Sequence, residues 1–122
     1  MKILVPTAGI VPAKEKADYI MEIAKRLNAD VAVIHILDLG EESGGEEALK
    51  VFEERGAKKG VNVKTYLKEG NVVPTIVDFA ESEDAGLIVM GATEGRIVAE
   101  WILTDVIDKT QIPVVIIPTF HI

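Results

Sequence analysis

The chain has 122 residues, of which 48% are hydrophobic and 27% charged, and its formal net charge at pH 7 is −7. This composition excludes intrinsic disorder. Because the chain has no cysteine, disulfides, thiol catalysis and thiolate metal sites are excluded as well. The negative net charge argues against nucleic acid and anionic membranes as partners. No apolar run approaches the roughly 18 residues of a membrane span and no signal-peptide pattern opens the chain, so we expect one cytoplasmic domain over residues 1–122.

The first predicted strand is the apolar run at residues 3–5, which Pro6 ends. A helix that ends near Asn28 follows, because apolar residues recur at steps of three and four: Ala17, Ile20, Ala24 and Leu27. Residues 31–37 (VAVIHIL) then predict a strand that is apolar on both faces apart from His35. Such a strand is typical of a parallel sheet that helices cover on both sides.

The middle of the chain continues the alternation. Residues 41–45 are predicted to form a loop, and residues 46–59 a helix that Gly60 ends. Residues 61–67 (VNVKTYL) alternate between apolar and polar, which indicates a strand near an edge of the sheet. A third helix is predicted with Asn71 as its N-cap and with these apolar positions: Val73, Ile76, Val77 and Ala80.

Residues 87–90 predict a short buried strand that ends at Gly91, and a fourth helix follows with one apolar side: Val98, Trp101, Ile102 and Val106. The last predicted strand is Val114–Ile117, and its flanking prolines, Pro113 and Pro118, favour an edge position because proline cannot donate to a ladder. Strands and helices alternate throughout, so right-handed crossovers predict an α/β fold: a doubly wound, five-stranded parallel sheet of order 3-2-1-4-5 with helices on both faces.

Ligands of such sheets bind beyond the C-terminal ends of the strands, at the point where the strand order reverses. Here that point lies between the first and fourth strands, which are followed by residues 6–9 (PTAG) and 91–96 (GATEGR). Neither segment contains a Walker or a G-x-G-x-x-G motif. The glycine-rich residues 43–45 follow the second strand and are predicted to be a flexible loop.

Five segments together carry a resemblance to a known family: KILVPTAG, HILD, Gly70, LIVMGATEGR and IPVVIIP. In their order and spacing, over essentially the whole chain, they are similar to the universal stress protein family. The resemblance implies the fold predicted above and homodimers that pair through the last strand. It also implies one of two branches, of which one binds ATP and the other does not.

The resemblance places a candidate nucleotide cleft at eight residues: Pro6, Thr7, Ile36, Met90, Gly91, Gly95, Arg96 and Thr104. In the ATP-binding branch an aspartate follows the first strand, and glycines with a hydroxyl hold the phosphates. In this chain Ala8 stands at the position of the aspartate. Glu94 stands at the position of the second glycine, and Gly95 is displaced from it by one residue. Asp105 stands at the position of the hydroxyl residue.

The two carboxylates decide which branch the chain resembles more closely. Two like charges about 4 Å apart repel by about 1 kcal/mol in water and by about 4 kcal/mol at an effective dielectric constant near 20. We therefore expect Glu94 and Asp105 to oppose a triphosphate, and the chain to belong to the branch without ATP and to need no cofactor. The alternative is an adenine-nucleotide sensor that binds ATP with Mg²⁺ in this cleft.

The sequence offers no catalytic constellation. Its serines are Ser43 and Ser82, neither of them near a plausible base, so we predict that the protein is not an enzyme. His35 is a single histidine inside a strand and is predicted to be a hydrogen-bonded core group. The acidic residues are scattered along helices, which argues against a metal site.

The expected function is that of a stress-response regulator which acts through protein contacts. Its protein partner is not identified by the sequence, apart from a second copy of the chain. The exposed edge of Val114–Ile117 would otherwise favour aggregation, so we expect two copies to pair there in an antiparallel manner, as two-fold symmetry requires.

Overall fold

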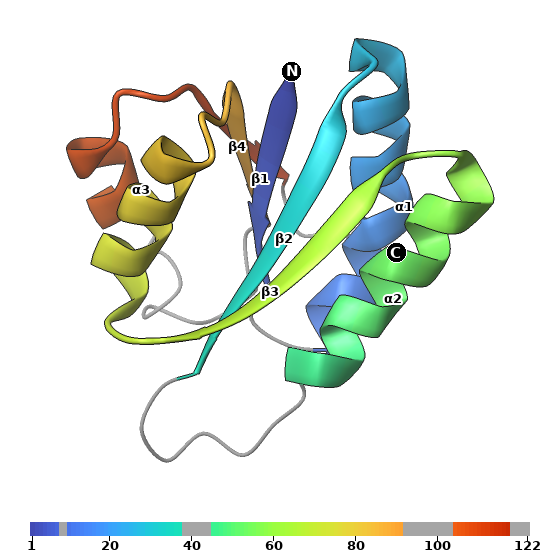
Figure 1. Ribbon diagram of the computed structural model, residues 1–122, viewed down its shortest axis with the longest axis horizontal. Coiled ribbons are helices and arrows are strands. Elements are labelled where there is room, and N and C mark those ends of the chain that lie inside the picture. Colours follow the sequence, from blue (N-terminus) through green and yellow to red (C-terminus); the bar gives the residue numbers. More distant parts are fainter. Residues whose placement is uncertain (8–9, 38–44, 92–103, 118–122) are drawn as a thin grey trace.

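The computed structural model describes residues 1–7, 10–37, 45–91 and 104–117 (Figure 1). Five parallel strands form one sheet in the order β3-β2-β1-β4-β5, which confirms the predicted topology. The strands are β1 (Lys2–Pro6), β2 (Asp30–Leu37), β3 (Val63–Glu69), β4 (Leu87–Gly91) and β5 (Val114–Ile117).

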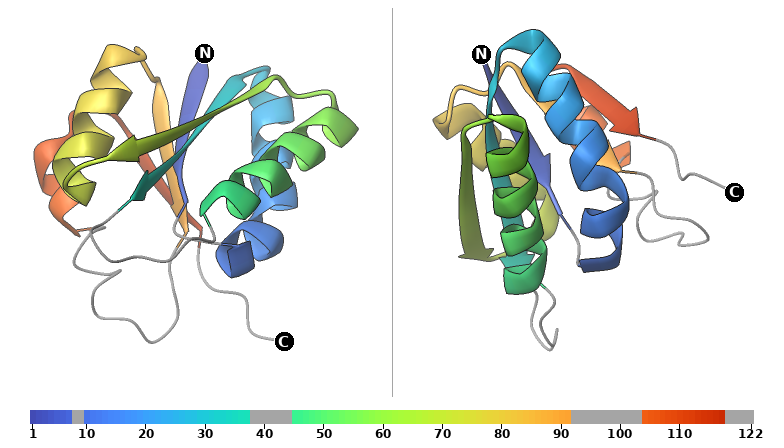
Figure 2. Two further views of the ribbon diagram at one scale, coloured as in Figure 1. Left: turned by 60° about the horizontal axis from the view of Figure 1, so that its bottom comes forward. Right: turned by 90° about the vertical axis from the view of Figure 1, so that its right-hand side faces the viewer.

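Helices cover both faces of the sheet (Figures 1 and 2). Helices α1 (Ile10–Leu27) and α2 (Gly45–Lys59) lie side by side on one face, and α3 (Val72–Ser82) and the helical residues 104–109 lie on the other. None of the helices in these described ranges combines the length and the apolar character that crossing a bilayer requires.

Each face of the sheet has its own core. In β2, Val31 and Val33 pack toward α1 and α2, whereas Ala32 and Ile34 pack toward α3, and all four side chains are buried. Full burial on both faces explains why β2 is apolar at successive positions. β3 is the far edge of the sheet, and its side chains are half-buried or exposed, in agreement with its alternating sequence.

The structure departs from the predicted boundaries and caps most clearly at β3, Asn71 and Gly45. β3 runs from Val63 to Glu69 and not over residues 61–67; its first pair is Val31 with Val63, and the Asn62 carbonyl accepts the Val31 N–H beside that pair. Asn71 has extended backbone at the N-cap of α3, but its side chain makes no capping bond; its carbonyl accepts the Thr75 N–H.

The third difference is Gly45, which was expected in a loop and is the first residue of α2. It is buried because α2 begins directly above the ring of His35. Gly60 ends α2 with φ +72°, the left-handed conformation expected of a glycine after a helix. Of the predicted fourth helix, Val106 is described and buried, while Val98, Trp101 and Ile102 lie outside the described residues.

Candidate functional site

The end of β1 is held by two hydrogen bonds from β2. Pro6 is the last residue of β1, and the N–H of Thr7, the next residue, donates to the carbonyl of Ile34 at 2.9 Å. The Thr7 carbonyl lies 2.8 Å from Nδ1 of His35. A carbonyl can only accept, so Nδ1 of His35 is the donor in this hydrogen bond.

His35 is therefore a structural residue of the site. Its side chain is 4% exposed, and the bond to Thr7 fixes the backbone at the point where the chain leaves β1. This confirms the prediction of a hydrogen-bonded core histidine. The neighbouring Gly45 leaves room for the ring, because a Cβ there would lie 2.7 Å from Cγ of His35 and closer still to Cδ2 and Nε2.

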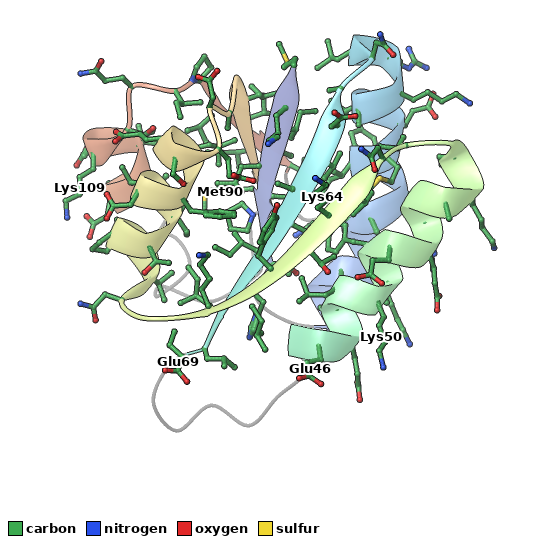
Figure 3. All side chains as sticks on the ribbon, viewed as in Figure 1. Glu46, Lys50, Lys64, Glu69, Met90 and Lys109 are labelled. Atoms are coloured by element: carbon green, nitrogen blue, oxygen red, sulfur yellow. The ribbon has the colours of Figure 1, made fainter. Side chains whose placement is uncertain are left out.

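Two of the predicted site residues bury their side chains on the opposite face. Ile36 of β2 and Met90 of β4 are 7% and 6% exposed and belong to the core beneath α3. Figure 3 shows Met90 between the sheet and α3. The side chains of these two residues are therefore part of the core and not of the strand-end surface on the α1 and α2 side.

Gly91, the last residue of β4, contacts a residue that the sequence analysis did not single out. A Cβ built on Gly91 would lie 2.6 Å from Cδ, 2.8 Å from Nζ and 3.0 Å from Cε of Lys16. Lys16 belongs to α1 and is only 5% exposed. The spacing along the helix could have indicated this burial. Lys16 lies three residues after Ala13 and four before Ile20, on the buried face of α1, where an apolar residue is expected.

Lys16 and His35 are the buried polar or charged residues in the described part of the chain. Both lie on the α1 and α2 side of the sheet, and each contacts the end of a strand at the reversal of strand order: His35 at β1 and Lys16 at β4. Because buried polar groups are rare and costly, their gathering at this one place marks it as a candidate site. We refer to Thr7, His35, Lys16 and Gly91 as the switch-point cluster.

The remaining predicted site residues are described only in part. Thr104 begins the helical residues 104–109 with an exposed side chain, and Asp105 beside it is half-buried. Gly95 and Arg96 lie outside the described residues, as do Ala8 and Glu94.

A second polar cluster lies elsewhere, on the α3 side of β3. The Tyr66 hydroxyl donates to Oε1 of Glu83 at 3.1 Å, and Lys2 Nζ lies 3.5 Å from the same oxygen. Burial and, after it, the hydrogen bond to Glu83 raise the pKa of Tyr66 above 10.0. Tyr66 and Lys2 also line a pocket with Lys64 and Asn62, at the N-terminal ends of the strands and so away from the switch-point cluster.

The structure gives no sign of a metal centre in the ranges that it describes: no three side chains of histidine, aspartate or glutamate there are grouped to hold an ion.

Comparison with known proteins relates the chain to the universal stress protein family. Residues 1–118 match the model of the universal stress protein family. A universal stress protein of Methanocaldococcus jannaschii is 31% identical over 137 aligned positions, which cover 95% of this chain and 81% of that protein.

Solved structures show the same fold. A universal stress protein from Archaeoglobus fulgidus in complex with dAMP has a TM-score of 0.77 and 26% identity, over 96% of this chain and 97% of that one. Another universal stress protein, in complex with cAMP, has a TM-score of 0.81 at 19% identity and covers 98% of both chains, which is a likeness of fold.

Proposed function

Because this chain belongs to the universal stress protein family, we propose that it is a non-catalytic regulatory domain which acts as a homodimer joined along β5. Regulation then proceeds through contacts that the dimer makes with a partner protein. The proposal rests on the exposed apolar edge of β5.

β5 is the last strand of the sheet and, in the described part of the chain, pairs with β4 alone. Its middle residues, Val115 and Ile116, are 38% and 43% exposed, while Ile117 is 2% exposed. A free strand edge with apolar side chains favours pairing with another strand. Antiparallel pairing with a second copy satisfies the free backbone groups of both strands at once, in a closed two-fold assembly.

The surroundings of His35 support a non-catalytic role. Its Nδ1 is bonded to a backbone carbonyl and its ring is covered by the first residue of α2. A general base needs a reachable nitrogen within hydrogen-bond distance of the substrate's proton, and this burial favours the structural role instead.

Light scattering coupled to size-exclusion chromatography tests the dimer. We expect the mass of two 13.2 kDa chains at micromolar concentration. Ile116→Lys places like charges close together across the two-fold axis and is expected to give monomers. Ile107→Lys is the matched control, since Ile107 is 48% exposed but lies outside β5, and it should remain dimeric. A monomeric wild-type protein would contradict the proposal.

A second candidate function is that of an adenine-nucleotide sensor. Two observations favour it. Thr7, Gly91 and Lys16 lie at the strand ends, and the 26% identical universal stress protein from Archaeoglobus fulgidus was solved in complex with dAMP. Three residues argue against ATP itself. The ATP-binding branch has an aspartate, a glycine and a hydroxyl residue at the positions that are occupied here by Ala8, Glu94 and Asp105.

The nucleotide function is tested on freshly purified protein. Mass spectrometry of the small molecules released on denaturation, and calorimetry with AMP and with Mg·ATP, should reveal an adenine nucleotide and tighter binding of AMP than of ATP. If no nucleotide is released and neither compound binds, the sensor function is wrong, and the homodimer proposal is unaffected.

A further inference from the structure

The pocket at the N-terminal ends of the strands lies on the α3 face of the sheet, at the opposite end of the strands from the switch-point cluster. Its volume is about 100 Å³. Neither the dimer edge nor the candidate nucleotide cleft includes it. Its lining combines charged, polar and small side chains from three neighbouring strands and the residue before β3: Lys2, Asp30, Ala32, Asn62, Lys64 and Tyr66.

The register of the sheet explains why a pocket forms at this place. Ala32 pairs with Leu4 of β1 on one side and with Lys64 of β3 on the other, and it is the smallest of the three side chains. It points to the α3 face, where it belongs to the core. Neighbouring strands lie about 4.8 Å apart, so the larger side chains on both sides rise above the alanine. Ala32 is therefore the floor of the pocket.

One wall of the pocket is held in place by contacts within the protein. Lys2 Nζ lies 3.5 Å from Oε1 of Glu83, and the Tyr66 hydroxyl donates to the same oxygen at 3.1 Å. Glu83 follows the end of α3, so it connects that helix to β1 and to β3. The charge of Lys2 is thus compensated by Glu83, and this wall is polar without an excess of either sign.

Asp30 and Lys64 add one charge of each sign beside Ala32. Asp30 begins β2, and Lys64 projects from β3 on the side away from α2 (Figure 3). Both are exposed, and neither belongs to an ion pair with another described residue. Lys64 pairs with the residue two positions after Asp30, so their Cα atoms lie roughly 8 Å apart, given about 4.8 Å between strands and about 3.3 Å per residue. A small ligand above Ala32 can therefore contact both.

We propose that this pocket binds a small free α-amino acid, with its carboxylate at Lys64 and Asn62 and its ammonium at Asp30. The lining contains two ammonium groups and, with Glu83 beside it, two carboxylates. A ligand that carries both signs and no net charge keeps this balance, whereas a simple anion is repelled by Asp30 and a simple cation by Lys64. A volume of 100 Å³ holds about three water molecules at about 30 Å³ each, which suits glycine or alanine and excludes a nucleotide.

Calorimetry with glycine, acetate and methylamine tests the proposal, because acetate and methylammonium each carry one of the two charges of glycine. The wild type should bind glycine most tightly. Lys64→Gln and Asp30→Asn should each weaken glycine binding by roughly three- to fivefold, as expected for one exposed ion pair. Lys68→Gln is the matched control, since Lys68 is exposed on the same face of β3 but does not line the pocket, and its glycine affinity should equal that of the wild type.

Ala32→Val tests the position of the ligand without changing a charge. The larger side chain fills the floor and should abolish glycine binding, and circular dichroism checks that the variant is folded. The two charge variants alter exposed side chains and should fold like the wild type, so they decide the matter even if Ala32→Val is unfolded. The proposal is overturned if the wild type does not bind glycine, if it binds acetate as tightly as glycine, or if both charge variants keep the wild-type glycine affinity.

Discussion

Among the described residues, the two buried polar side chains, His35 and Lys16, each lie against a glycine, and the two side chains differ in flexibility. Gly45 lies over the rigid imidazole ring of His35, whereas Gly91 lies beside the flexible end of Lys16. A methyl group added to either glycine meets atoms that already fill the space. The ring of His35 cannot withdraw, because Nδ1 is bonded to the Thr7 carbonyl, but the lysine can.

Gly45→Ala should therefore destabilise the fold. Within a helix, replacing glycine by alanine ordinarily gains roughly 0.5–1 kcal/mol, but overpacking against a fixed ring costs about 1–3 kcal/mol, so the loss outweighs the gain. Urea unfolding monitored by circular dichroism measures the difference. Lys50→Ala is the control in the same helix: its exposed side chain points away from the sheet (Figure 3), and its effect should stay within about 0.5 kcal/mol. A Gly45→Ala protein as stable as the wild type would contradict this packing.

At the scale of elements, the link between β3 and α3 combines packing with charge. The rings of Tyr66 and Phe79 meet edge to face with centroids 4.8 Å apart, and Lys68 Nζ lies 4.9 Å from the Phe79 centroid. The Tyr66 hydroxyl then donates to Glu83, just beyond the end of α3. These contacts attach the edge strand β3 to α3.

The raised pKa of Tyr66 makes this link sensitive to high pH. Tyr66 holds its proton more tightly in the folded protein than in the unfolded chain, so its contribution to stability is complete below pH 10.0 and is lost as the pH rises through the folded pKa. Glu83→Gln should lower the pKa of Tyr66 toward 10.0, and burial should keep part of the shift. The ultraviolet titration of tyrosinate in a Tyr19→Phe background follows Tyr66 alone, since the chain has two tyrosines. An unchanged titration curve in Glu83→Gln would refute the contribution of Glu83.

The elements also show what local sequence can and cannot predict. β2 and β5 were predicted almost to the residue, because continuous apolar runs between polar residues or prolines have few other interpretations. The start of α2 was not predicted correctly. Gly45 is its first residue and packs against the ring of His35, which lies 10 residues earlier in the sequence, so no local pattern indicates this contact. Leu27 follows the apolar spacing of α1 and is nevertheless 46% exposed, since the helix ends there and turns away from the sheet at Asn28 with φ 52°.

For the whole molecule, the strand order followed from the alternation of strands and helices and from the handedness of crossovers, and it placed the candidate site at the ends of β1 and β4. Pro6, Thr7 and Gly91 could be named in advance as candidates from the strand order, and Met90 from the resemblance to the family. Lys16 could not, because its burial depends on a contact between α1 and the end of β4 that no short-range pattern contains.

Gly91 is also the register partner of Ile117, the last residue of β5. The candidate site at the end of β4 and the proposed dimer strand therefore share one rung of the ladder, which gives ligand binding and dimerisation a direct route for coupling. If a nucleotide at Gly91 changes the dimer dissociation constant by some factor, dimerisation must change the nucleotide affinity by the same factor. Such a rung would let the concentration of a metabolite determine how many copies of the protein are assembled.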